Sequence, residues 1–140
     1  MMKKIMMMLA CSLITMTSMA KTGDKGDIEK VITTLMKGVD HQKGDEILKT
    51  FRENATVQAT NQGKIISVDY KQFAAMHASK KFGGRDRSVE IVSVDITDGI
   101  MATAKVVAQD DKVHYVYYLN LSNTDGKWLI QSFLQHSKLK

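Results

Sequence analysis

Cysteine and proline are almost missing from this 140-residue sequence, which contains one cysteine and no proline. The single cysteine, Cys11, lies in an N-terminal segment that we expect to be removed, so the mature chain would contain none. Disulfide bonds, thiolate catalysis and cysteine metal ligands are thereby excluded for the mature protein. Low-complexity tracts and internal repeats are missing as well.

The first 20 residues have the pattern of a secretory signal peptide. Lys3 and Lys4 give a positive start, residues 5–16 form a short, methionine-rich apolar stretch, and Ser18-Met19-Ala20 fits the small-x-small rule for cleavage. We expect cleavage after Ala20, and therefore a periplasmic or secreted protein.

Two alternatives stay open for this segment. An uncleaved membrane anchor would need about 20 apolar residues in a row, whereas serine and threonine side chains interrupt this stretch. A lipoprotein would use Met8-Leu9-Ala10 as a lipobox before Cys11. Its apolar core would then be residues 5–10 alone, shorter than the roughly 7 residues expected at minimum. We expect no membrane span.

The mature chain has the size of one domain. Residues 21–26 are polar and contain glycine, which predicts a short tether before a domain at residues 27–140. Loss of Lys3 and Lys4 with the leader lowers the net charge from +5 to +3. So small an excess is a weak argument for nucleic acid, and we expect no nucleic-acid partner.

Apolar residues in the first part of the domain recur with helical spacing. The pattern predicts a first helix from Asp27, a short second helix after Asp45 that ends near Asn54, and a third helix over residues 70–79. The first helix has one apolar face, formed by Ile28, Val31, Ile32, Leu35, Met36 and Val39.

The remaining segments have strand composition and are separated by hairpin signals such as Asp98-Gly99. The predicted strands cover residues 56–60, 64–67, 88–96, 100–108, 113–122 and 127–135. This order of elements predicts an α+β fold, in which three N-terminal helices pack on one face of a curved antiparallel sheet.

Strand alternation predicts a face that is built to be filled. Residues Ile100, Ala102, Ala104, Val106 and Ala108 share one face of the fourth strand and are small enough to leave space above them. The fifth strand has a large apolar face that includes Tyr115 and Tyr117. Apolar groups also occur on the opposite faces, as expected if one face covers the helices and the other is buried in a dimer or is simply exposed.

The chain resembles nuclear transport factor 2-like domains, and within that superfamily the group of small bacterial proteins named putative lumazine-binding proteins. The resemblance covers nearly all of residues 27–133 and depends on the order and spacing of its motifs: Gly38, Gly44-Asp45-Glu46-Ile47-Leu48, Phe51, Asn54-Ala55-Thr56-Val57, Gly63-Lys64, Ser67 to Phe73, Tyr115 to Leu121, and Asp125-Gly126-Lys127-Trp128 before Ile130. It implies a cone formed by a curved sheet and helices, with a pocket between them, and often a homodimer. It implies little about activity, since the superfamily hosts unrelated functions.

The ketosteroid isomerases share the fold that the resemblance implies, and they use a pocket carboxylate as base. The position equivalent to that acid is Ala59 here, with Gln58 beside it, and neither can act as a base. The first helix also lacks a tyrosine that could donate to an oxyanion. The isomerase mechanism is therefore disfavoured.

A hydrolase or dehydratase of this fold would need a histidine with a carboxylate partner. His77, on the third helix, is the one histidine that we expect to face the interior, and Asp69 lies about two turns away. His77 is therefore a weak catalytic candidate, set against the alternative of a hydrogen-bonded structural histidine. No two histidines have the spacing of a metal-ligand pair, and we expect no metal and no cofactor.

An apolar wall with a few polar groups suits a flat, partly apolar molecule. The candidate ligand-binding residues are Gln58, Phe73, His77, Tyr115, Tyr117 and Trp128. Lys80, Lys81, Arg85 and Arg87 form a basic loop with Phe82, which could meet an anion or a membrane headgroup or could be solvated.

The leading hypothesis is an exported, non-catalytic domain, homodimeric, that binds a small molecule or a protein partner. A small cone-pocket enzyme that uses His77 and a purely structural or interaction protein are the alternatives.

Overall fold

The computed structural model describes residues 23–140, which contain three helices and six strands. The predicted leader and its predicted cleavage site therefore lie outside the described residues. A long helix covers residues 23–40. The other elements are α2 (Gly44–Leu48), β1 (Phe51–Asn61), β2 (Lys64–Asp69), α3 (Tyr70–Ala78), β3 (Ser88–Thr97), β4 (Met101–Gln109), β5 (Val113–Asn123) and β6 (Trp128–Leu139).

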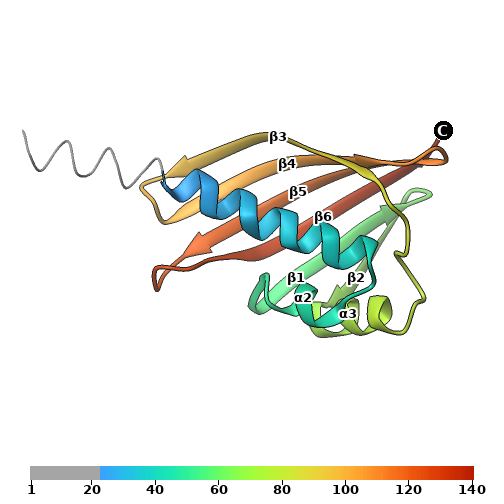
Figure 1. Cartoon of the computed structure of the whole chain (residues 1–140), viewed down its shortest axis with the longest axis horizontal. Coiled ribbons are helices and arrows are strands. Elements are labelled where there is room, and N and C mark those ends of the chain that lie inside the picture. The colour runs from blue at the N-terminus through green and yellow to red at the C-terminus, as the bar shows by residue number, and fades with distance from the viewer. Residues whose placement is uncertain (1–22) are drawn as a thin grey trace, which may run out of the picture.

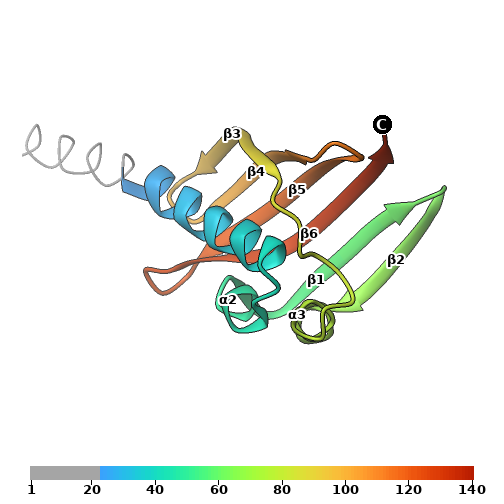
Figure 2. The ribbon, with the colours of Figure 1, turned by 45° about the vertical axis from the view of Figure 1, so that its right-hand side comes forward.

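The six strands form one curved, unclosed sheet in the order β2-β1-β6-β5-β4-β3. The α+β class with helices packed on a curved sheet is confirmed. Figures 1 and 2 show the long helix lying across β3 to β6, with α2 and α3 beside β1 and β2. One pair departs from the expected antiparallel sheet, because β1 and β6 are parallel. Three successive hairpins bring β6 back beside β1 from the far edge, and they fix its direction.

The long helix is amphipathic as predicted, with a fully or nearly fully buried stripe of Ile28, Ile32, Leu35, Met36 and Val39. It begins earlier than the predicted Asp27, since residues 23–26, expected to form a tether, are helical. Asp24 explains why this turn is ordered: its Oδ1 atom accepts a hydrogen bond of 3.1 Å from Nε1 of Trp128.

The small residues of β4 have a different role from the one expected. Ala102, Ala104, Val106 and Ala108 are buried in the same apolar cluster as the stripe of the long helix. The helix therefore fills the predicted face except at Ile100, which precedes β4 and is 56% exposed. The large face of β5 is confirmed on the same side of the sheet, where Tyr117, Leu119 and Leu121 are buried.

The predicted second helix is too long, because α2 ends at Leu48 and β1 begins at Phe51. Sheet hydrogen bonding explains the early strand, since the backbone N–H of Ile130 donates to the carbonyl of Thr50. The register between β1 and β6 shifts between Phe51 and Thr56, around Asn54 with its φ of 65°. Phe51, expected on a helix face, instead packs from the strand against aromatic rings of α3 and β6.

Candidate functional site

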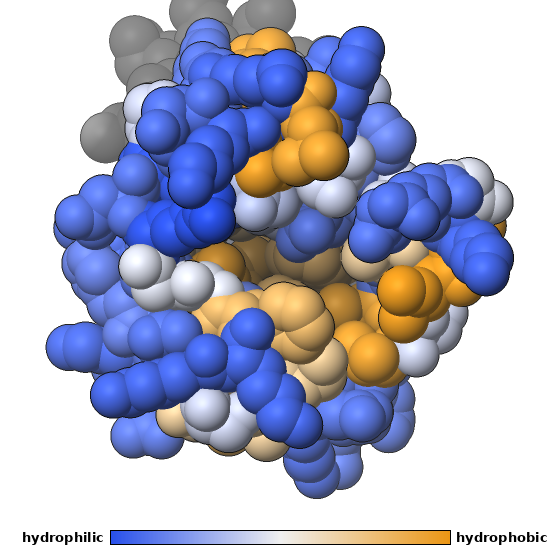
Figure 3. All heavy atoms as spheres, turned by 90° about the vertical axis from the view of Figure 1, so that its right-hand side faces the viewer, coloured by the Kyte–Doolittle hydropathy of each residue, from blue (hydrophilic) through white to orange (hydrophobic). Residues whose placement is uncertain are grey.

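A cavity of about 530 Å³ lies between the sheet and α3. Its walls come from β1, β2, β5, β6, α3, the last turn of the long helix and residues 79–87, here called the mouth loop. Figure 3 shows this end of the molecule as a hollow with hydrophobic residues inside and hydrophilic residues around it. The cavity volume falls within the range of small-molecule sites, about 300–1,000 Å³.

The part of the wall formed by the β1–β2 hairpin is apolar except near the turn, where Thr60 and Asn61 line the cavity. Val57 and Ala59 of β1 face the cavity together with Ile66 and Val68 of β2. Strand alternation turns Gln58 to the other side of the sheet, where its Nε2 atom donates to Oγ of Ser67 at 3.1 Å. Ala59 leaves room for the cavity because its side chain is a single methyl group.

Aromatic rings line the inner wall. The ring centroids of Phe73 and Phe133 are 5.1 Å apart, and those of Tyr117 and Phe133 are 5.3 Å apart. Tyr115 and Tyr117 stack at 6.2 Å with an angle of 14° between their planes. These rings come from α3, β5 and β6, and they offer flat apolar surfaces to an aromatic ligand.

A buried polar network lies on the same wall and centres on Arg87. Its Nε atom donates to Oδ1 of Asp40 at 2.6 Å, and Nη1 donates to the hydroxyl of Tyr117. The guanidinium group also stacks on the ring of Tyr115, 4.8 Å from its centroid. The side chains of Arg87 and Asp40 are only 4% and 10% exposed, so this is an ion pair taken out of water.

Charge and burial act against each other in this network. Burial alone would lower the pKa of Arg87, but the neighbouring Tyr117 and Asp40 outweigh it and raise that pKa. Burial raises the pKa of Tyr117 to about 12, although the Arg87 guanidinium opposes the shift. Tyr117 therefore keeps its proton at neutral pH. Its hydroxyl accepts from Arg87, which leaves that proton available for an acceptor in the cavity.

His77 lies on the cavity wall as a neutral imidazole. Burial lowers its pKa below the usual 6.5, and Arg87 adds to the effect. Its Nδ1–H group donates to the carbonyl of Phe73 at 2.9 Å, which leaves Nε2 as the acceptor. Within residues 23–140, no carboxylate oxygen lies within 4.0 Å of a His77 nitrogen. Asp69 does not serve as its partner, because its Oδ1 accepts from the backbone N–H of Lys71 at the start of α3.

The structure brings together four of the six predicted ligand-binding residues, namely Phe73, His77, Tyr115 and Tyr117. The other two lie elsewhere: Gln58 is on the opposite face of the sheet, and Trp128 is buried at the far end of β6 beside Asp24. Trp128 was expected in the pocket because it is large and apolar, yet it packs in the core under the long helix.

Sequence reasoning missed Asp40 and the buried position of Arg87. Arg87 belongs to the basic loop, and a run of charges gives no sign that one member is buried. Asp40 offers a weak signal, because it lies four residues after Met36 and so continues the buried stripe of the helix by one polar residue.

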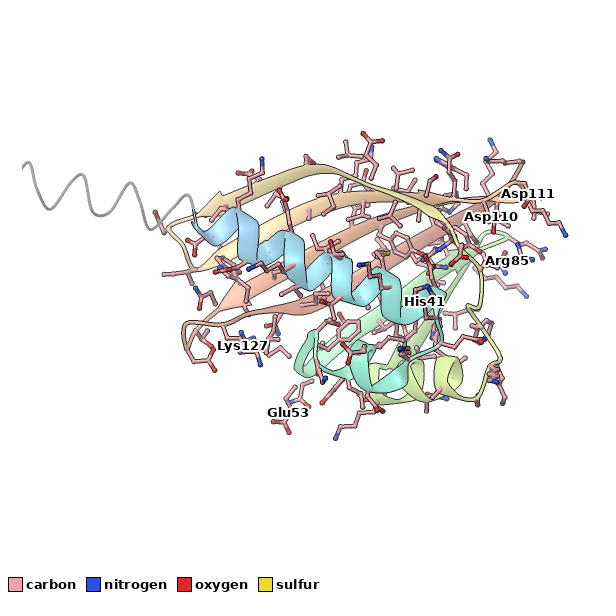
Figure 4. All side chains as sticks on the ribbon, viewed as in Figure 1. His41, Glu53, Arg85, Asp110, Asp111 and Lys127 are labelled. Carbon is pink, nitrogen blue, oxygen red and sulfur yellow. The ribbon has the colours of Figure 1, made fainter. Side chains whose placement is uncertain are left out.

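The mouth loop is tied to the body of the protein at several points. Nε2 of Gln42 donates to the carbonyl of Phe82, and Nε2 of His41 lies 3.4 Å from Oδ1 of Asp86. Nη1 of Arg85 donates to Oδ2 of Asp110 at 3.1 Å. Figure 4 shows His41, Arg85 and Asp110 at one end of the molecule, opposite Glu53 and Lys127.

Asp110 is a well-held anchor for Arg85. Backbone N–H groups of Lys112 and Val113 donate to its Oδ1 atom, and they lower the pKa of Asp110 to about 2. The carboxylate is therefore charged across the physiological pH range.

No cluster of three or more His, Cys, Asp or Glu side chains within residues 23–140 is arranged to hold a metal ion. No helix in that range combines the length and apolar character that a membrane crossing requires.

Solved structures of known proteins share this fold. An NTF2-like protein of unknown function from Shewanella baltica OS155 is 18% identical, with a TM-score of 0.75 over 84% of this chain and 95% of its own. A ketosteroid isomerase-like protein from Erwinia carotovora atroseptica is 13% identical, with a TM-score of 0.68 over 80% and 94%. A protein named as a putative scytalone dehydratase, from Novosphingobium aromaticivorans, is 13% identical, with a TM-score of 0.68 over 86% and 88%.

At such low identities these similarities establish the fold alone. A comparison with curated proteins finds no match. The sequence profile of the family described as “Putative lumazine-binding” matches residues 23–133, which is most of the chain. The chain therefore belongs to this family, as its sequence motifs indicated, and its fold is that of NTF2-like proteins.

Proposed function

We propose that the protein is an exported binding domain that holds a small, partly apolar molecule in the cavity and does not convert it. The observation that carries the proposal is the cavity itself: about 530 Å³, with aromatic and aliphatic side chains on its inner wall and polar side chains, such as Asn61, His77 and Gln135, among its lining residues. Such a lining buries an apolar body and orients it through hydrogen bonds.

The polar groups of the cavity are suited to holding a ligand. The Tyr117 hydroxyl can donate and Nε2 of His77 can accept, so a ligand with one acceptor and one donor can be oriented. The family description names lumazine, a flat heterocycle, but an exported protein has limited access to ligands confined to the cytosol. Lumazine is therefore one probe among several.

The enzyme alternative has less support. A histidine base needs a group that orients it, and His77 is hydrogen-bonded to a backbone carbonyl and has no carboxylate nearby within the described residues. The acid of the cavity wall, Asp40, is paired with Arg87.

Homodimer formation through the outer face of the sheet is part of the proposal. Val116, Tyr118 and Leu134 lie on the face opposite the helices, and Tyr118 pairs with Leu134 across β5 and β6. Tyr118 is 51% exposed and Leu134 is 39% exposed. An apolar patch of this kind on a sheet suits a protein interface.

A thermal-unfolding assay tests the binding function. Wild type and Ala59→Trp, which places an indole ring in the cavity from β1, are each unfolded with a panel of flat aromatic molecules that includes lumazine. A ligand at a hundred times its Kd stabilises the wild type by about 2.7 kcal/mol, and Ala59→Trp should gain clearly less because the indole ring obstructs the cavity. A panel that shifts neither protein, or shifts both equally, overturns the proposal.

A further inference from the structure

The charged residues on the cavity wall are mostly cationic. Lys81, Arg85 and Arg87 line the cavity, against one acid, Asp40. Asp40 is already engaged, since Arg87 donates to it at 2.6 Å. The remaining charges, Lys81 and Arg85, both belong to the mouth loop, so the positive charge is concentrated at the entrance.

The two cations at the entrance keep capacity for an anion. Within residues 23–140, Lys81 has no carboxylate within 4.0 Å. Arg85 uses Nη1 for Asp110, and its side chain remains 50% exposed. A guanidinium group carries five N–H donors, so most of them remain for a carboxylate or sulfonate.

Other acids lie at this end of the molecule without forming the cavity wall. Asp86 lies near His41, and Asp110 accepts from two backbone N–H groups as well as from Arg85. Asp111 is a neighbour of Asp110 and is exposed. None of these three acids lines the cavity. A ligand inside the cavity therefore contacts Lys81 and Arg85 and not these carboxylates.

We propose that the cavity selects organic anions with a flat apolar body, whose acidic group lies at the entrance against Lys81 and Arg85. The body lies inward against Phe73, Tyr115 and Phe133, where the wall is aromatic. This inference rests on the proposed binding function and names the chemical class of its ligand. It also gives the basic loop a role, because charge at a cavity entrance attracts and orients an anion.

A pair of fluorescent probes with one skeleton tests the inference. Anilinonaphthalene sulfonate carries a sulfonate, and N-phenylnaphthylamine has the same rings without it. Both are titrated into the purified protein at about 0.02 M and about 0.5 M NaCl. We expect the sulfonate to bind about fivefold more tightly at low salt, and the advantage to shrink at high salt.

Two matched variants locate the charge effect. Lys81→Gln should weaken sulfonate binding about two- to fivefold and leave the neutral probe unaffected. Lys80→Gln removes the same charge from the same loop, but Lys80 does not line the cavity, so it should change neither affinity. The Ala59→Trp variant reports any probe bound outside the cavity.

Each result has a distinct meaning. Failure of both probes to bind, or equal binding to Ala59→Trp, overturns the proposed function and this inference with it. Equal affinities of the two probes in wild type overturn the selection of anions and leave the binding function intact. Equal losses in Lys81→Gln and Lys80→Gln also overturn the inference, because the effect would then come from overall charge and not from the cavity entrance.

Discussion

Asp40 and Arg87 form the one ion pair that the described residues bury, and each holds the other's charge inside the protein. Removing one partner of such a pair leaves an uncompensated buried charge. The network also positions Tyr117, so it links the stability of the fold to the shape of the cavity wall.

We expect Asp40→Asn to lower the free energy of unfolding by about 3 kcal/mol, measured by urea denaturation. The double variant Asp40→Asn/Arg87→Met should recover most of that loss, because it removes both charges. Glu46→Gln is the matched control, since Glu46 pairs with Lys49 on the surface and should cost less than about 0.5 kcal/mol. Equal losses in Asp40→Asn and Glu46→Gln would contradict the account.

His77 should make stability depend on pH. Its pKa is lowered in the folded protein, so the unfolded chain binds a proton more readily. The stability of the folded protein that depends on neutral His77 is therefore fully present above the unfolded pKa of about 6.5. It is lost as the pH falls below that value. We expect the wild type to lose more stability than His77→Gln between about pH 7.5 and pH 5, measured by urea denaturation at each pH. Identical losses would show that His77 does not carry the effect.

At the scale of elements, the mouth loop is held by close packing at Gly83. A Cβ atom at Gly83 would lie 2.1 Å from the carbonyl oxygen of Val39, and φ is +76°. Gly63, in the β1–β2 turn, has the same φ but nothing within 4 Å of such an atom. An alanine at Gly63 therefore adds only the cost of the backbone conformation, whereas an alanine at Gly83 adds that cost and the cost of a clash.

We expect Gly63→Ala to cost about 1 kcal/mol, the usual penalty of a left-handed conformation. Gly83→Ala should cost clearly more and should release the mouth loop. Urea denaturation measures the stability cost of each variant, and limited proteolysis within residues 79–87 measures release of the mouth loop. Similar stability and similar cleavage in the two variants would show that the loop is not anchored at Gly83.

Sequence reasoning predicted the last four strands within a few residues, because paired turn signals such as Asp98-Gly99 are local. It could not predict that β1 runs parallel to β6, since that pairing joins residues 76 to 79 positions apart. For the site, alternation correctly grouped Tyr115 with Tyr117. Burial of Arg87 depends on Asp40, 47 residues away, and local pattern carries no record of such a contact.

At the scale of the whole molecule, the two faces of the sheet have different roles. Its inner face carries the long helix and the cavity, and its outer face carries Val116, Tyr118 and Leu134. The proposed dimer would leave the cavity entrance open, because the entrance faces the end of the sheet shown in Figure 3.

We expect the wild type to be a dimer in solution and Tyr118→Lys to be a monomer with the same far-ultraviolet circular dichroism, because a lysine in the apolar patch opposes its burial. Size-exclusion chromatography with light scattering measures both masses. A monomeric wild type at tens of micromolar would contradict the dimer and would leave the cavity unaffected.

The central claim is that the cavity holds a small molecule, and native mass spectrometry of protein isolated from its own host tests it most directly. We expect the wild type to carry a bound molecule of defined mass, at no more than one per chain, and Ala59→Trp isolated in the same way to lack it. Identical spectra for the two proteins, with no bound molecule in either, would contradict the account.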